Sequence, residues 1–380
     1  MPAEDAGLVR QRLANPHVEV EDAPKSQKAI CRLSGRVDNP RDSTRSAVLL
    51  STLMVRLADA FARLSPDRRV HGISAVLLPF TPGGAIDWDS FERHLVRTHA
   101  AGLDVAVNMD TGFGDLLDGA ERSAVLAATR AALGPRAPFY AGAFADVDGS
   151  HRAGLAAIAR AGATPVLVQS RATHGLSPVE RASWYRRACE GVERALAFEL
   201  APVFAPHGEI WDDETFARLL EIPALVGAKH SSLDRALELR RLAARDRLRP
   251  DFRVYTGNDL AIDMVAYGSD YLLGLSTFAP EAFATRDRAL AAGDVAFLAL
   301  NDALQHLGNV GFRAPVPAYK HSAAQYLHLT GTLPSDAIHP RAARRPGSDR
   351  ILLLDCAVRL GAIDDPERVF AERVQPFLAD

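Results

Sequence analysis

Short apolar runs alternate with longer amphipathic segments over more than half of the chain. Runs of this kind are typical of strands in a buried parallel sheet, and they lie at 70–80, 103–109, 138–144, 165–168, 197–204, 225–228, 252–255 and 271–275. Eight runs, each followed by a helix candidate, fit a closed (β/α)8 TIM barrel better than an open doubly wound sheet. No Gly-x-Gly-x-x-Gly motif follows the first run, so a nucleotide-binding fold has little support.

Helix start signals occur between the apolar runs. Ser177 is an N-cap candidate that is followed by Pro178, which suits the first helical position, and by Glu180 at the capping-box spacing. Comparable starts occur at 87–90, 118–121, 212–215 and 232–234. The third of these favours a helix N-terminus over a metal site for the acidic group at 209–214.

Two further regions flank the predicted barrel of residues 67–294. Residues 1–66 are polar for most of their length and predict an N-terminal extension, in which the apolar spacing at 46–64 indicates one docking helix. Residues 295–380 lose the strand pattern and predict a C-terminal helical appendage, interrupted by a segment rich in Pro, Arg and Gly at 339–347.

The composition excludes several classes of partner. The net charge is -3, so no excess of basic residues is available to neutralise nucleic-acid phosphates. The longest apolar stretch, 47–61, is interrupted by charged residues and is too short to cross a bilayer, and the acidic N-terminus does not resemble a secretory signal. The three cysteines are widely spaced and give neither a disulfide framework nor a Cys-x-x-Cys site. We therefore expect a cytoplasmic protein that acts on a small molecule without a metal or other cofactor.

Lysine is rare in this chain. Of the 44 basic residues only four are lysines, at positions 25, 28, 229 and 320. Arginine supplies positive charge but no amine chemistry, because its guanidinium stays protonated. Lys229 ends an otherwise uncharged apolar run, where burial lowers the pKa of an amine and favours its attack on a carbonyl carbon to form a Schiff base. The alternatives are an ion pair at a strand end, and codon bias as the cause of the scarcity.

Motifs in a fixed order carry a family resemblance. Segments 72–80, 121–122, 219–229, 256–259 and 317–320 resemble, in order and spacing, the dihydrodipicolinate synthase and N-acetylneuraminate lyase superfamily. The resemblance implies a barrel lyase whose strand-six lysine, here Lys229, forms a Schiff base with pyruvate. It also implies a homodimer or homotetramer, a structural Lys320, and substrate contact at the strand-seven motif that contains Gly257.

The segment after the second predicted strand departs from the family pattern. Thr111 and Gly112 match family residues that bind the keto-acid carboxylate through hydroxyls and backbone amides. Asp110 adds a negative charge at this place. It is a candidate general base, or a contact for a substrate hydroxyl.

Two other family residues are missing. The strand-four tyrosine that relays protons in the family is absent from 170–174, so Arg171, Thr173 or His174 takes that place in an active enzyme. His174 is a candidate general acid or base, because histidine titrates near neutral pH. The arginine that holds a second carboxylate after strand five is also absent, so true dihydrodipicolinate synthase activity is not implied.

Two residues near the lysine have an acid–base side chain. Glu199 lies near the end of the fifth run and is a candidate proton shuttle or substrate anchor, the alternative being an ion pair with a barrel arginine. His230 follows Lys229 directly and should point to the opposite face of the strand, where it packs.

These observations predict a lyase or aldolase that joins Lys229 to pyruvate or a related small 2-keto acid through a Schiff base. Two alternatives stay open. Asp110 motivates an imine-forming lyase that acts on a neutral aldehyde or sugar-derived substrate. The missing tyrosine and arginine motivate a catalytically degenerate barrel that binds a metabolite.

Overall fold

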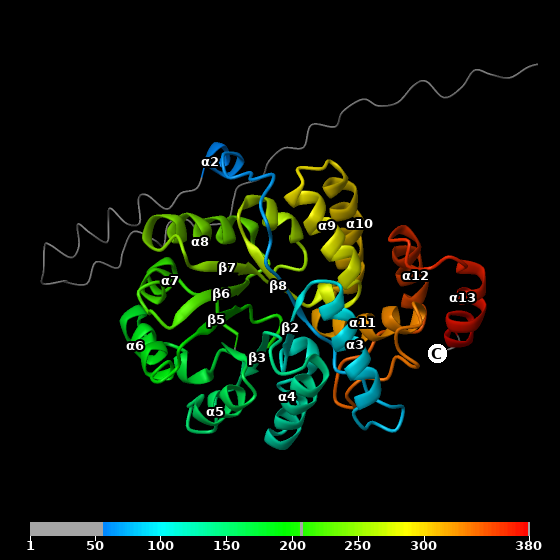
Figure 1. The fold of residues 1–380 in the computed structure, drawn as a ribbon, viewed down its shortest axis with the longest axis horizontal. Helices are drawn as coiled ribbons and strands as arrows, with labels where there is room; N and C mark the ends of the chain where they lie inside the picture. The colour runs from blue at the N-terminus through cyan, green and yellow to red at the C-terminus, as the bar shows by residue number, and fades with distance from the viewer. Residues whose placement is uncertain (1–55, 206–207, 379–380) are drawn as a thin grey trace, which may run out of the picture. The chain divides into compact units, whose positions relative to one another are not determined.

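Eight parallel strands close into a barrel in the computed structural model, which describes residues 56–205 and 208–378. Each strand pairs with the next along the chain, and the first pairs with the last (Figure 1). The strands are β1 Gly72–Ala75, β2 Asp104–Val107, β3 Phe139–Ala143, β4 Thr164–Leu167, β5 Ala195–Leu200, β6 Leu225–Ser231, β7 Arg253–Thr256 and β8 Asp270–Leu273. Each overlaps one predicted run, and the predicted (β/α)8 TIM barrel is confirmed.

Helices surround the barrel; the predicted start signals mark five of them, and two others begin without one. They are α3 Trp88–Ala100, α4 Gly119–Leu133, α5 Arg152–Arg160, α6 Pro178–Ala188, α7 Asp213–Leu219, α8 Arg235–Leu248 and α9 Pro280–Ala291, with the short 3-10 helix η4 Ile262–Tyr267 between β7 and β8. Five of them carry a side-chain N-cap that accepts a hydrogen bond from the free N–H three residues on, at Asp87, Asp118, Ser177, Asp212 and Asp234. Asp212 therefore caps α7, as the acidic group at 209–214 predicts.

Alternate residues of each strand face the barrel interior. The buried interior cluster consists of Ile73, Ala75, Ala106, Met109, Val166, Val168, Leu196, Phe198, Leu200, Tyr255 and Leu272. In the strand register, Lys229 of β6 lies beside Phe198 and Tyr255, so it also faces inward. Glu199 and His230 are paired with each other in the same register and face the helix layer. The alternation of side chains between the two faces of each strand therefore decides which polar side chains can reach the lysine.

The C-terminal region is helical, as expected. Its helices are α10 Ala296–Gly311, α11 Tyr319–Leu329, α12 Asp349–Arg359 and α13 Pro366–Arg373, drawn in yellow to red in Figure 1. Nearly all of α11 is buried, and it packs against α10 and α12. The predicted break at 339–347 contains neither helix nor strand. None of the helices in the described ranges combines the length and apolar character that a membrane span requires.

The predicted docking helix differs from expectation. Its first part, 46–55, lies outside the described residues, and the rest contains the short helix α2 Leu57–Phe61. Leu57 and Phe61 are largely exposed, and only Ala60 of α2 is buried. The segment instead contacts the barrel through polar groups, since the Ser65 N–H donates to the Ala266 carbonyl at 2.8 Å. Internal contacts divide the chain into Met1–Thr52 and Leu53–Asp380, and the second unit contains both the barrel and the C-terminal helices.

Candidate active site

Lys229 extends from β6 into the barrel interior. The residue is 7% exposed, and its Nζ lies 4.5 Å from the centroid of the Phe198 ring on β5. Within residues 56–205 and 208–378, its amine makes neither a hydrogen bond nor an ion pair. Burial lowers the pKa of Lys229, although the charges of Asp259 and Asp110 act in the opposite direction. Such an amine has a larger neutral fraction for attack on a carbonyl group.

Ser231 and Gly257 lie directly beside this lysine. Ser231 is two positions further along β6 and therefore shares its face, and its buried hydroxyl has no partner among the described residues. A Cβ atom at position 257 would lie 2.1 Å from the Ser231 Oγ and 2.7 Å from the Lys229 Cε. A side chain at this position would therefore force the Ser231 and Lys229 side chains to shift. Gly257 was predicted to bind substrate, and the structure places it against the Lys229 side chain.

Asp259 follows β7 and is the buried carboxyl group whose charge acts most strongly on the lysine. Its Oδ1 accepts a hydrogen bond from the Leu275 N–H at 2.7 Å. Burial raises the pKa of Asp259 to about 7, although the charge of Lys229 and the backbone N–H groups act to lower it. A carboxyl group with this pKa exchanges protons at neutral pH.

A cluster of four polar side chains joins the end of β2 to α11. Asp110 and Thr111 belong to the short 3-10 helix η2 Asp110–Gly112, and Tyr319 and Lys320 begin α11. The Tyr319 hydroxyl lies 2.9 Å from the Thr111 Oγ1 and donates to the Asp110 Oδ2 at 2.8 Å. The Lys320 Nζ donates to the Asp110 Oδ1 at 2.8 Å. The Asp110 charge is therefore offset by an ammonium group, and Lys320, which was expected to be structural, belongs to this cluster.

The backbone of η2 corrects one expectation. The Gly112 N–H donates to the Met109 carbonyl at 3.1 Å and so closes the first turn of η2. This amide is therefore not available for a substrate carboxylate, although Gly112 was predicted to bind one. The Thr111 hydroxyl contacts the Tyr319 hydroxyl, and its predicted role stays a prediction.

The strand-four loop supplies no buried titratable group at the predicted positions. Arg171 begins the short 3-10 helix η3 Arg171–Thr173 and His174 directly follows it, and both residues are exposed. Thr173 is buried, but its hydroxyl donates to the Ser170 carbonyl at 2.8 Å. The proposed roles of these three residues stay predictions.

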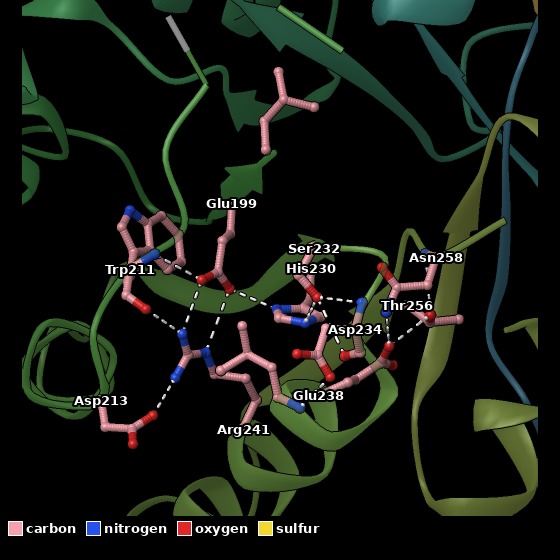
Figure 2. A network of polar contacts seen from close by, with 12 residues as sticks. Glu199, Trp211, Asp213, His230, Ser232, Asp234, Glu238, Arg241, Thr256 and Asn258 are labelled. Carbon is pink, nitrogen blue, oxygen red and sulfur yellow. Dashed lines mark hydrogen bonds and ion pairs between the residues drawn. The ribbon is translucent and has the colours of Figure 1, made fainter. Parts of the chain in front are cut away.

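Glu199 is not directed at Lys229, and this corrects its assignment as a proton shuttle. Figure 2 shows its carboxylate between Trp211, His230 and Arg241. One oxygen accepts from the Trp211 N–H and from Arg241, both at 2.8 Å, and the other lies 2.5 Å from the His230 Nδ1. Burial by itself would raise the pKa of Glu199, but His230 and Arg241 lower it to about 2. The ion pair with an arginine, which was the alternative, is what the structure contains.

The same network continues to β7. The Ser232 Oγ lies 2.7 Å from the His230 Nε2, which completes a serine–histidine–glutamate chain (Figure 2). The Ser232 oxygen also accepts from the Asp234 N–H at 3.0 Å, and Arg241 neutralises Glu199, so we assign this chain a structural role. Glu238 of α8 is fully buried and accepts from Thr256, Asn258 and Ser269. These contacts fasten the ends of β6 and β7, which carry Lys229 and Gly257.

Four site residues escaped the sequence-based assignment: Ser231, Asp259, Tyr319 and Lys320. The first two could have been found from local signals, because Ser231 shares the strand face of Lys229 and Asp259 belongs to the strand-seven motif. Tyr319 and Lys320 lie 209 and 210 positions from the Asp110 that they contact, and no local pattern connects them. Within the described ranges, no group of three or more His, Cys, Asp or Glu side chains could hold a metal ion.

Comparison with known proteins identifies relatives of the chain. A family model described as "Protein of unknown function (DUF993)" matches residues 68–379. The 4-hydroxy-tetrahydrodipicolinate synthase 1 of Streptomyces coelicolor is 30% identical over 236 residues, which cover 60% of this chain and 74% of that protein. The 4-hydroxy-tetrahydrodipicolinate synthase of Parasynechococcus marenigrum is 26% identical over 271 residues, which cover 70% of this chain and 87% of that protein.

Solved structures share the fold. YagE from E. coli K12, a prophage protein of the dihydrodipicolinic acid synthase family that was solved in complex with pyruvate, superimposes with a TM-score of 0.69 at 18% identity. The match covers 77% of this chain and 99% of YagE. At this identity the likeness concerns the fold alone, so the chemistry has to be argued from the residues of the site.

Proposed function

We propose a function from the premise that the chain belongs to the DUF993 family, within the dihydrodipicolinate synthase and N-acetylneuraminate lyase superfamily. It is a lyase of the class I aldolase type, which forms a Schiff base between Lys229 and pyruvate or a related small 2-keto acid. The observation that carries this proposal is the buried Lys229 amine, which makes no polar contact with the described residues and has a lowered pKa.

The neighbouring groups support the chemistry. The neutral Lys229 amine attacks the C2 carbonyl carbon, and loss of water gives a protonated imine that acts as an electron sink for making or breaking a carbon–carbon bond, or for dehydration of the adduct. The unpartnered Ser231 hydroxyl can donate to the substrate, and Asp259, with a pKa of about 7, can exchange protons near the imine.

The charge around Asp110 favours a keto acid over a neutral carbonyl compound. An unpaired carboxylate at this place would repel a substrate carboxylate. The Lys320 Nζ offsets that charge at 2.8 Å, so the reason for preferring a neutral aldehyde is weakened.

The missing family residues argue against dihydrodipicolinate synthase activity itself. No arginine is present at 199–204, at the end of β5 and after it, and no tyrosine is present at 170–174. We propose that the pyruvate-type imine meets another acceptor or leaving group. A cytoplasmic location and a homodimer or homotetramer belong to the same proposal, and sedimentation velocity measures the assembly.

Borohydride trapping tests the function. The full chain is incubated with pyruvate, reduced with borohydride and weighed intact, and peptide mapping locates the modified lysine. We expect one reduced adduct on Lys229, no adduct in Lys229→Met, and a normal adduct in the control Lys28→Met. Absence of an adduct with a panel of 2-keto acids would overturn the proposal. Preferential trapping of neutral aldehydes would support an imine-forming lyase that acts on a neutral aldehyde or sugar-derived substrate. No trapping of any carbonyl compound would support a catalytically degenerate barrel.

A further inference from the structure

A continuous chain of polar contacts leads from the barrel mouth to solvent. Thr111, Tyr319 and Asp110 are linked by hydrogen bonds of 2.9 and 2.8 Å, and Lys320 holds the outer end of the chain through Asp110. Thr111 and Tyr319 are buried, at 2% and 3% exposed, whereas the Asp110 side chain is 19% exposed. The chain thus connects a buried hydroxyl with a carboxylate that water can reach.

We propose that Tyr319, on the C-terminal helix α11, relays protons for imine formation in place of the missing strand-four tyrosine, with Thr111 on the substrate side and Asp110 on the solvent side. This inference rests on the proposed function of Lys229. It assigns a reaction step to the C-terminal appendage, which would otherwise only pack against the barrel.

The donor pattern gives the relay a direction. The Tyr319 O–H donates to the Asp110 carboxylate, so its oxygen accepts from the Thr111 O–H. The Thr111 oxygen then keeps lone pairs for a proton that arrives from the substrate. Reversal of both bonds carries a proton from a protonated Asp110 inward to the substrate.

The position of the relay suits the lysine. Asp110 and Asp259 are the two carboxyl groups whose charges act on the Lys229 amine, and both also act on the Tyr319 hydroxyl. Gly274, after β8, allows close approach, since a Cβ there would lie 3.0 Å from both the Thr111 Oγ1 and the Tyr319 Cε2. Thr111 follows the C-terminal end of β2 and Lys229 lies in the C-terminal half of β6, so both belong to the same end of the parallel barrel.

The acidity of Tyr319 favours a relay over a free base. Burial raises the pKa of Tyr319 well above its usual range, and Asp110 acts in the same direction although the bond to Thr111 opposes it. A tyrosinate is therefore disfavoured, and the hydroxyl passes one proton on as it receives another.

The proton balance of imine formation needs such a route. The neutral amine adds to the carbonyl carbon, and a proton moves from nitrogen to the new alkoxide oxygen to give a neutral carbinolamine. A second proton, delivered through Asp110, Tyr319 and Thr111, converts the hydroxyl group into departing water as the C–O bond breaks and the C=N bond forms. The product is the protonated imine plus one water, and solvent returns the consumed proton to Asp110.

Timed trapping in the full chain separates the relay from the lysine. Protein and pyruvate are mixed, quenched with borohydride at increasing times and weighed intact, which gives both the rate and the final extent of imine formation. We expect Tyr319→Phe to slow the rate by about 100-fold, within the range for general acid–base catalysis, and to leave the final extent nearly unchanged. The control is Tyr326→Phe, on the same helix, whose buried hydroxyl has no partner among the described residues.

A second pair of variants separates proton transfer from packing. Thr111→Val removes the hydroxyl and should slow trapping as Tyr319→Phe does, whereas Thr111→Ser keeps the hydroxyl and should restore most of the rate. A wild-type rate in Tyr319→Phe, or equal rates in the two Thr111 variants, would overturn the relay while leaving the function of Lys229 intact. Absence of any adduct in the wild-type chain would instead overturn the proposed function, and the relay with it.

Discussion

The Glu199 carboxylate lies 2.5 Å from the Nδ1 of His230, on the barrel face opposite to Lys229. His230 directly follows Lys229 in the sequence, Glu199 is its register partner on β5, and both are directed at the helix layer. Arg241 completes the contact from α8. The pair therefore fixes the strand that carries the lysine and does not share in its chemistry.

Loss of the Glu199 charge should cost stability and leave trapping intact. Glu199→Gln removes one partner of a buried ion pair, and we expect the free energy of unfolding at pH 7 to fall by about 3 kcal/mol in urea titrations. The matched control is Glu214→Gln, an exposed partner of Arg218, which should change the free energy of unfolding by less than about 1 kcal/mol. A clearly lower trapping rate in Glu199→Gln, as the loss of a proton shuttle would cause, would contradict this assignment.

The Glu199 contribution should depend on pH in one direction. Its pKa in the folded protein is lowered to about 2 from 4.5, so its stabilisation is present above pH 4.5 and is lost as the pH falls toward 2. The difference in unfolding free energy between wild type and Glu199→Gln should therefore shrink as the pH is lowered from 5 to 3. A constant difference over this range argues against the ion pair as the source of stability.

Ser231 should affect substrate affinity. Its hydroxyl is the buried polar group beside Lys229 that lacks a partner in the described structure, and a hydrogen bond to a charged substrate contributes about 1.5–3 kcal/mol. We expect Ser231→Ala to raise the pyruvate concentration for half-maximal trapping by about 10-fold. Ser74→Ala is the matched control, because Ser74 is also buried without a partner but lies on β1 with its neighbours Ile73 and Ala75 facing inward. Equal effects of the two variants would count against substrate contact.

Gly257 should tolerate no side chain. In Gly257→Ala the new methyl group would overlap the Ser231 Oγ and the Lys229 Cε, and overpacking of this kind costs about 1–3 kcal/mol. We expect a lower melting temperature and a clear loss of trapping, because the lysine is displaced. Gly119→Ala, where a Cβ meets nothing within 4 Å, should retain both stability and trapping. Unchanged trapping in Gly257→Ala would show that the lysine does not need its present position.

Asp259 should tune the lysine amine. The Asp259 charge raises the pKa of Lys229 against the effect of burial, so Asp259→Asn should lower that pKa further. We expect the pH at which the trapping rate is half-maximal to move to lower pH by about one unit, measured by timed borohydride quenching. Asp251→Asn, which alters a carboxylate that is 77% exposed, serves as the control and should leave the profile in place. A shift to higher pH in Asp259→Asn would contradict the electrostatic argument.

The sequence by itself determined the barrel and its lysine, because both depend on local patterns. Apolar runs of strand length predict β1 to β8, and capping residues such as Ser177 mark helix starts through short-range hydrogen bonds. Lys229 could be singled out for the same reason, since an amine that ends an uncharged apolar run is expected to be buried. The alternation of side chains along a strand was also enough to place His230 on the opposite face.

Only the tertiary structure decided which polar groups surround the lysine. The side of the barrel that Glu199 faces depends on how β5 is registered against β6, and that register is a long-range property. Tyr319 and Lys320 reach Asp110 because the start of α11 packs against η2, more than 200 positions away along the chain. Propensities and spacings act over a few residues, whereas a site of this kind is assembled by packing between distant elements. The place of Tyr319 in it could therefore be found only in three dimensions.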